Sequence, residues 1–167
     1  AHLAKSAFGG RVISIGIVGT AYVIVLFGFM NWFGDASLWG LLDWSNLAGQ
    51  PTTVYKDAVM IDANGERLTS VFQYANSYAA YLIAVILASL IIIVHAKSKI
   101  AIASASFMLV PAIISFILTL SRGGIVVFPI ILIIVLPFLK FSRQLLSLGY
   151  LVLSGIAAVL ILTPVTK

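Results

Sequence analysis

The chain has 167 residues, of which 62% are hydrophobic and only 9% are charged, and its mean hydropathy is +1.16. A soluble globular protein is roughly half apolar and about a quarter charged, so this composition excludes that class and indicates a small polytopic membrane protein. The absence of cysteine excludes disulfides and thiolate metal sites. The net charge of +5 comes from cations scattered singly near the ends of apolar runs, which is typical of membrane topology. We therefore expect a lipid bilayer as partner and no nucleic acid.

Five apolar segments are long enough to cross a hydrocarbon core of about 30 Å, which takes roughly 20 helical residues. They cover residues 12–30, 77–94, 100–120, 123–139 and 145–163. Backbone polar groups cannot face lipid unpaired, so each segment should be a helix, with kinks at Pro111, Pro129 and Pro137. The predicted fold class is an all-α polytopic integral membrane protein with a single membrane domain over residues 1–167. Because the chain begins with Ala1 rather than methionine, we expect an internal fragment of a larger protein.

The second segment contains a stripe of small residues that predicts close helix packing. Ala80, Ala84 and Ala88 recur every four residues and would share one helix face. Small side chains at such positions let a neighbouring helix approach closely.

The distribution of lysine and arginine predicts the orientation. With the N-terminus in the cytoplasm, the short loops 95–99 and 140–144 fall on the cytoplasmic side and carry the local excess of positive charge. The C-terminus and the loop 31–76 then lie outside. The cytoplasmic cations are Lys5, Arg11, Lys97, Lys99, Lys140 and Arg143, and the outer ones are Lys56, Arg67, Arg122 and Lys167.

The outer loop, residues 31–76, contains two recognisable segments. Trp32, Trp39 and Trp44 indicate an interfacial segment at headgroup depth. Further on, Asn64-Gly65 separates two apolar-containing runs, which predicts a short β-hairpin with these residues at the centre of a type I′ turn. Such a hairpin places Arg67 just before the second span.

The tetrapeptide Ser121-Arg122-Gly123-Gly124 is the strongest candidate for chemistry. It places a cation between two long apolar runs, on the same predicted side as Arg67. An arginine fork fits a phosphate bidentately, the glycines permit close approach of a ligand, and Ser121 can cap the following helix. The alternative is that each arginine extends to lipid headgroups and binds nothing specific.

Other polar residues have simpler interpretations. Asn76 is predicted to be the N-cap of the second span, and Tyr74, Tyr78 and Tyr81 to be interfacial aromatics. No span carries an ionisable residue near its middle, which argues against a proton- or ion-coupled transporter. The sequence contains no motif for a metal or a cofactor, so we expect neither.

The order of these pieces resembles the O-antigen ligase and O-antigen polymerase (Wzy-type) family of bacterial membrane glycosyltransferases. A stretch from Arg67 to Asn76 runs into a span, and one helical pair later comes the Ser-Arg-Gly turn at residues 121–123. Two more spans and an outward exit follow. The resemblance covers roughly residues 60–167, although the stretch before Asn76 is poorer in glycine than the commoner family form.

The resemblance implies a metal-independent transferase in a bacterial cytoplasmic membrane. Such an enzyme moves a glycan from a polyprenyl-diphosphate carrier to an acceptor hydroxyl outside the cytoplasm. Arg67 and Arg122 match positions that hold the diphosphate, with Ser121, Gly123 and Gly124 in support. The catalytic histidine of the family lies in a later loop, so no catalytic residue is expected here, and His2 and His95 fall on the opposite side. The alternatives are a flippase or transporter subunit for lipid-linked oligosaccharide, or a non-catalytic membrane scaffold.

Overall fold

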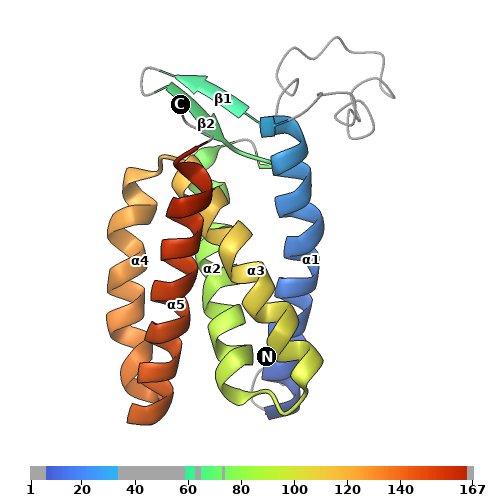
Figure 1. The fold of residues 1–167 in the computed structure, drawn as a ribbon, viewed down its shortest axis with the longest axis vertical. Coiled ribbons are helices and arrows are strands. Elements are labelled where there is room, and N and C mark those ends of the chain that lie inside the picture. Colours follow the sequence, from blue (N-terminus) through green and yellow to red (C-terminus); the bar gives the residue numbers. More distant parts are fainter. Residues whose placement is uncertain (1–6, 34–58, 63–64, 73, 165–167) are drawn as a thin grey trace.

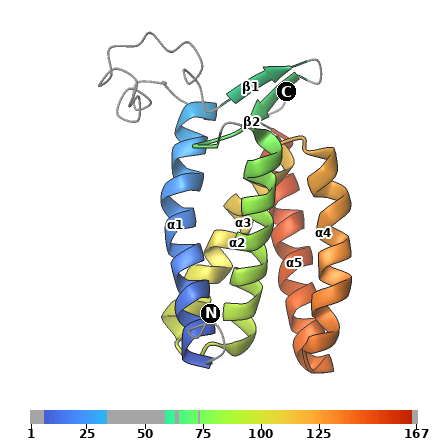
Figure 2. The ribbon, with the colours of Figure 1, turned by 180° about the vertical axis from the view of Figure 1, so that it is seen from behind.

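The computed structural model describes residues 7–33, 59–62, 65–72 and 74–164, which are mostly helical (Figure 1). The elements in chain order are α1 (Ala7–Phe33), β1 (Val59–Asp62), β2 (Gly65–Leu68), α2 (Ala75–His95), α3 (Lys99–Leu118), α4 (Arg122–Val135), the 3₁₀ helix η4 (Leu136–Phe138) and α5 (Phe141–Leu162). The helices form a bundle with the hairpin at one end (Figures 1 and 2). The tryptophans at positions 39 and 44 of the predicted interfacial segment lie outside the described residues.

Four helices, α1, α2, α3 and α5, are long and apolar enough to cross a membrane. The fourth predicted span, residues 123–139, is shorter than expected. Its α-helix has 14 residues and ends at Val135, and Pro137 is the second residue of the 3₁₀ turn that follows. At about 1.5 Å per α-helical residue and about 2 Å per 3₁₀ residue, the two together span roughly 27 Å. Four of the five predicted segments therefore form helices that could cross a membrane, and the other is a shorter apolar helix.

Helix α2 is the centre of the bundle. It contacts each of the other four α-helices, and 61% of its most apolar stretch is buried, against 22% for α5. The predicted small-residue stripe is wrong for two of its three members, because Ala80 and Ala84 are exposed and only Ala88 is buried. The close approach to α4 is made instead by Ala79, which is fully buried.

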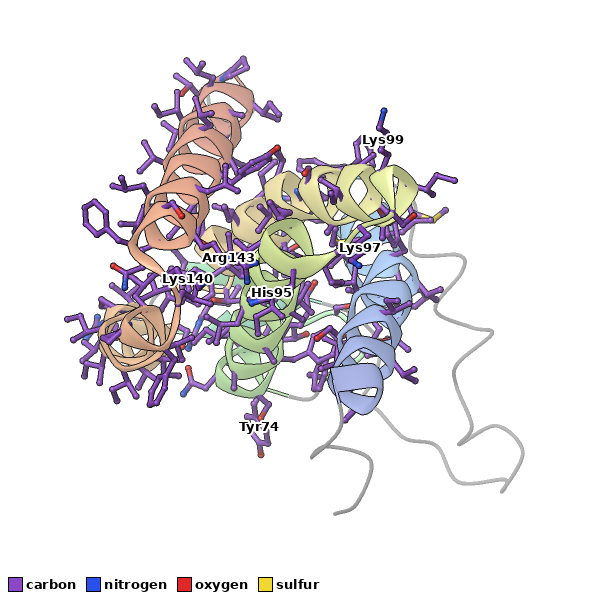
Figure 3. The ribbon with its side chains drawn as sticks, turned by 90° about the horizontal axis from the view of Figure 1, so that it is seen from below. Tyr74, His95, Lys97, Lys99, Lys140 and Arg143 are labelled. Carbon is purple, nitrogen blue, oxygen red and sulfur yellow. The ribbon has the colours of Figure 1, made fainter. Side chains whose placement is uncertain are left out.

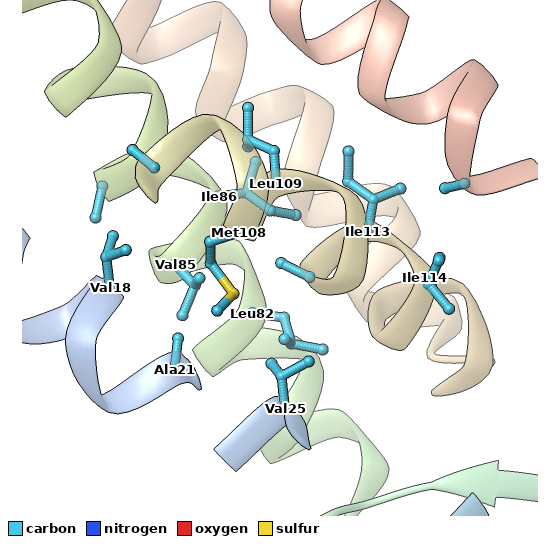
Figure 4. Close-up of a cluster of buried hydrophobic side chains, with 14 of the residues drawn as sticks. Val18, Ala21, Val25, Leu82, Val85, Ile86, Met108, Leu109, Ile113 and Ile114 are labelled. Atoms are coloured by element: carbon cyan, nitrogen blue, oxygen red, sulfur yellow. The ribbon is translucent and has the colours of Figure 1, made fainter. Parts of the chain in front are cut away.

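The apolar core lies between α1, α2 and α3 (Figure 4). Figure 4 labels ten of its side chains: Val18, Ala21 and Val25 from α1; Leu82, Val85 and Ile86 from α2; and Met108, Leu109, Ile113 and Ile114 from α3. Hydrogen bonds also join these helices, since the Tyr22 hydroxyl donates to the Ser104 carbonyl oxygen at 2.7 Å. A hydrogen-bonded polar pair within an apolar bundle stabilises one packing arrangement of the helices relative to other arrangements.

The hairpin forms where it was predicted, with a turn one residue earlier. Strands β1 and β2 are antiparallel, and Asp62 pairs with Gly65. The two-residue connection is therefore 63–64, which lies outside the described residues, and not Asn64-Gly65. Gly65 still takes a positive φ of 101°, a conformation that costs glycine little. This register places Arg67 opposite Met60.

The connections separate into two groups at opposite ends of the bundle (Figures 1 and 2). The hairpin, the α3–α4 turn and the end of α5 lie together, and the α2–α3 and α4–α5 connections lie at the other end. This matches the predicted grouping of loops. Which end faces the cytoplasm stays a prediction.

Candidate functional site

Arg67 is held against the α3–α4 turn. It is the third residue of β2, and only 9% of its surface is exposed. Its Nε donates to the Thr119 carbonyl oxygen at 2.9 Å, and its Nη2 donates to Asn76 Oδ1 at 3.1 Å. A largely buried guanidinium needs such acceptors, because a buried charge without them is costly.

Asn76 connects Arg67 to Ser121. Its Oδ1 accepts hydrogen bonds from both, at 3.1 Å from Arg67 and 3.0 Å from the Ser121 hydroxyl. The oxygen must be the atom that faces Arg67, because arginine only donates. The prediction of Asn76 as an N-cap is wrong: Tyr74 is the N-cap of α2 and makes no side-chain capping bond. Asn76 is the second residue of α2, and its side-chain amide faces Arg67 of β2 and Ser121 at the start of α4.

The α3–α4 turn is fixed by its own short-range bonds. The Thr119 hydroxyl donates to the Phe116 carbonyl at 2.7 Å and accepts from the Ser121 N–H at 3.3 Å. Leu120 between them has a positive φ of 47°, which costs a non-glycine residue about 1 kcal/mol or more. The bonds on either side offset this cost and keep the chain in one conformation.

Ser121 caps α4, as predicted. Its Oγ accepts from the Gly124 N–H at 3.0 Å, and its carbonyl oxygen accepts from Ile125 at 3.0 Å. Arg122 is the first residue of α4 and its side chain is exposed. The N–H groups of Arg122 and Gly123 precede the first intrahelical bond. The positive end of the helix dipole therefore lies beside an exposed arginine.

The two glycines of the turn have different surroundings. Gly123 is exposed and nothing lies within 4 Å of the position a Cβ would occupy. Gly124 is buried, and a Cβ there would lie 3.0 Å from a ring carbon of Phe116 and 3.1 Å from the Cβ of Ala79. Gly124 therefore serves the packing of α4 on α2 and α3.

The tyrosines near this end fall into separate environments. Tyr74 is 60% exposed, in keeping with an interfacial aromatic, whereas Tyr78 is fully buried, so the interfacial interpretation is wrong for Tyr78. The Tyr78 ring stacks on Phe72 with centroids 5.6 Å apart. Its buried hydroxyl lies near those of Ser115 and Ser70. Tyr81 is half-buried and its hydroxyl lies 3.2 Å from that of Thr20.

The structure thus joins three of the five predicted site residues by hydrogen bonds, Arg67 to Ser121 through Asn76 and Ser121 to Gly124. Arg122 and Gly123 follow Ser121 in the chain and are exposed. Sequence reasoning did not identify Thr119 as a site residue, and it identified Asn76 only as a helix cap. The only available signal for Thr119 was its place two residues before Ser121. His95 lies at the opposite end of the bundle (Figures 1 and 3), away from this assembly.

Within the described ranges, no group of three or more His, Asp or Glu side chains is arranged to hold a metal ion. Comparisons with protein-family models, with curated proteins and with solved structures find no match for this chain. The contacts of Arg67 and of Ser121, the residue before Arg122, together with the sequence pattern, are therefore the basis for a functional proposal.

Proposed function

We propose that this chain is the donor-binding part of a membrane glycosyltransferase of the O-antigen ligase or polymerase type. It would hold a polyprenyl-diphosphate-linked glycan at the hairpin end of the bundle. The observation that carries the proposal is the hydrogen-bonded assembly of Arg67, Asn76 and Ser121, which fixes the turn that presents Arg122. The order of the motifs along the chain adds support.

The two arginines would act on the diphosphate in different ways. Exposed Arg122 offers a fork of donors that fits phosphate oxygens. Buried Arg67 adds positive charge that is already oriented by Thr119 and Asn76, and fixed charge of this kind stabilises a leaving group that gains negative charge. The N-terminus of α4 contributes in the same direction.

Neither arginine can activate the acceptor hydroxyl. A guanidinium stays protonated in proteins, so it cannot remove a proton. The proposal therefore assigns donor binding and charge stabilisation to this chain, and it assigns the base to a part of the complete protein outside these residues.

Binding of undecaprenyl diphosphate by the purified protein tests the proposal. Arg122→Ala should weaken binding roughly tenfold, equivalent to about 1.4 kcal/mol, and Arg122→Lys should retain part of the affinity because lysine keeps the charge without the fork. Lys97→Ala, which removes an exposed cation at the opposite end, is the matched control. In the complete protein, the same variants should follow that order in glycan transfer, seen as a ladder on a gel. Undiminished binding and transfer by Arg122→Ala would exclude the diphosphate role.

A further inference from the structure

The connection between α4 and α5 carries exposed aromatic and cationic side chains within a few residues of one another in the sequence. Phe138 is 86% exposed and Phe141 is 72% exposed, while Lys140 lies between them and is exposed as well. Arg143 follows one turn later and is half-exposed. We call these four residues the aromatic–basic patch.

The backbone of this patch is held in one conformation. The Leu139 N–H donates to Leu136 at 2.9 Å, and the Arg143 N–H donates to Lys140 at 2.8 Å. The Gln144 side chain then donates to the Leu139 carbonyl at 2.9 Å. Lys140 and Arg143 are three residues apart at the start of α5, so their side chains project from neighbouring positions of the same turn.

The electrostatic field at this end of the bundle is positive. In Figure 3, Lys140 and Arg143 lie where α5 begins and His95 lies where α2 ends, with Lys97 beside α1 and Lys99 pointing away. All five acidic residues fall between positions 35 and 66 of the sequence. Glu66 is the only one whose side chain the structure describes, and it lies in the hairpin at the other end (Figure 1). No described carboxylate therefore neutralises the patch.

We propose that the aromatic–basic patch binds the headgroup of an anionic phospholipid in the membrane leaflet at this end. The phosphate would lie against Lys140 and Arg143, and the rings of Phe138 and Phe141 would enter the adjoining acyl region. Exposed aromatics beside cations fit an amphipathic ligand, which has a charged group next to a hydrocarbon chain. A small soluble anion would contact the two cations and neither ring. The patch lies at the opposite end from Arg67 and Arg122, so this inference does not depend on the proposed transferase.

Native mass spectrometry of the detergent-purified protein, given equimolar phosphatidylglycerol and phosphatidylcholine, tests this inference. The wild-type protein should retain phosphatidylglycerol preferentially. The double variant Lys140→Gln/Arg143→Gln should lose roughly 20- to 30-fold in that preference, since each cation near an anionic headgroup is worth about fivefold. The double variant Lys97→Gln/Lys99→Gln removes the same charge from the same end and should keep most of the preference.

Three results would overturn the inference. Equal losses in the two double variants would show that net charge alone attracts the lipid. An unchanged preference in Lys140→Gln/Arg143→Gln would place the lipid elsewhere on the protein. Displacement of phosphatidylglycerol by millimolar inorganic phosphate would assign the patch to free anions, because phosphate has no acyl chain for Phe138 and Phe141 to contact.

Discussion

The Asn76 side chain is hydrogen-bonded to both Arg67 and the capping serine of α4, so its replacement tests the hydrogen-bonded assembly directly. Asn76→Ala removes the acceptor of two bonds, at 3.1 Å from Arg67 and 3.0 Å from Ser121. A bond to a charged donor contributes about 1.5–3 kcal/mol and a neutral one about 0.5–1.5 kcal/mol. Because Asn76 is exposed, water replaces part of this hydrogen bonding in the variant. We therefore expect the free energy of unfolding to fall by about 2 kcal/mol.

The assay is denaturant unfolding in detergent micelles, followed by far-ultraviolet circular dichroism. Ser77→Ala is the matched control, since Ser77 is exposed in the same helical turn and a surface change of this kind alters stability by about 0.5 kcal/mol or less. If Asn76→Ala unfolds at the same denaturant concentration as Ser77→Ala, the two hydrogen bonds do not hold the turn and the reasoning fails.

Asn76→Asp separates the stability of the assembly from its charge. The carboxylate has the same shape and accepts from Arg67 and Ser121 in the same positions, so stability should stay within about 1 kcal/mol of the wild type. The added negative charge lowers the positive potential that Arg67 supplies, and binding of undecaprenyl diphosphate should weaken by roughly tenfold. A stable Asn76→Asp variant with unchanged binding would mean that Arg67 contributes no charge to the ligand.

Three further substitutions probe the α3–α4 turn by the same unfolding assay. Gly124→Ala should destabilise by about 1–3 kcal/mol, because its Cβ would meet Phe116 at 3.0 Å and Ala79 at 3.1 Å; a neutral result would show that α4 can move away. Gly123→Ala, with nothing within 4 Å, should be neutral or stabilising by up to about 1 kcal/mol, and a clear loss would contradict its open surroundings. Ser121→Ala should cost about 1–2 kcal/mol through loss of the cap and of the bond to Asn76; a cost no larger than that of Ser77→Ala would argue against both bonds.

Local patterns in the sequence were sufficient for the helices, the hairpin and one cap. Apolar length determines a membrane helix because the backbone has no other partner in lipid, and a serine before an apolar run is a reliable capping signal. The length of α4 was harder to predict, since hydropathy continues through Pro137 while the α-helix ends at Val135. Proline lacks the N–H that would continue the α-helix. The change to a 3₁₀ turn therefore has a local cause, which hydropathy alone does not indicate.

Contacts between distant segments could not be predicted from one sequence. Arg67 and Thr119 are 52 residues apart, and no local rule indicates that a carbonyl in a turn will face that arginine. The small-residue stripe failed for a related reason. Helical spacing identifies Ala80 and Ala84 as sharing a face, but only the positions of α3 and α4 decide that Ala79 is the alanine in close contact.

The burial of Arg67 and the exposure of Arg122 mean that the two arginines do not test the proposed function equally. Substitution of Arg67 would remove the donor to the Thr119 carbonyl oxygen and one of the two hydrogen bonds to Asn76 Oδ1. Lost activity would then follow from a displaced turn even if Arg67 never met a ligand. Arg122 begins α4 after the capping serine, and its removal leaves the hydrogen bonds of Ser121 with Asn76 and Gly124 in place. A loss of diphosphate binding in Arg122→Ala at unchanged stability therefore identifies a ligand contact, whereas the same loss in Arg67→Ala does not. The order of experiments follows: Arg122 decides whether an anion binds, and Asn76→Asp then decides whether Arg67 contributes its charge.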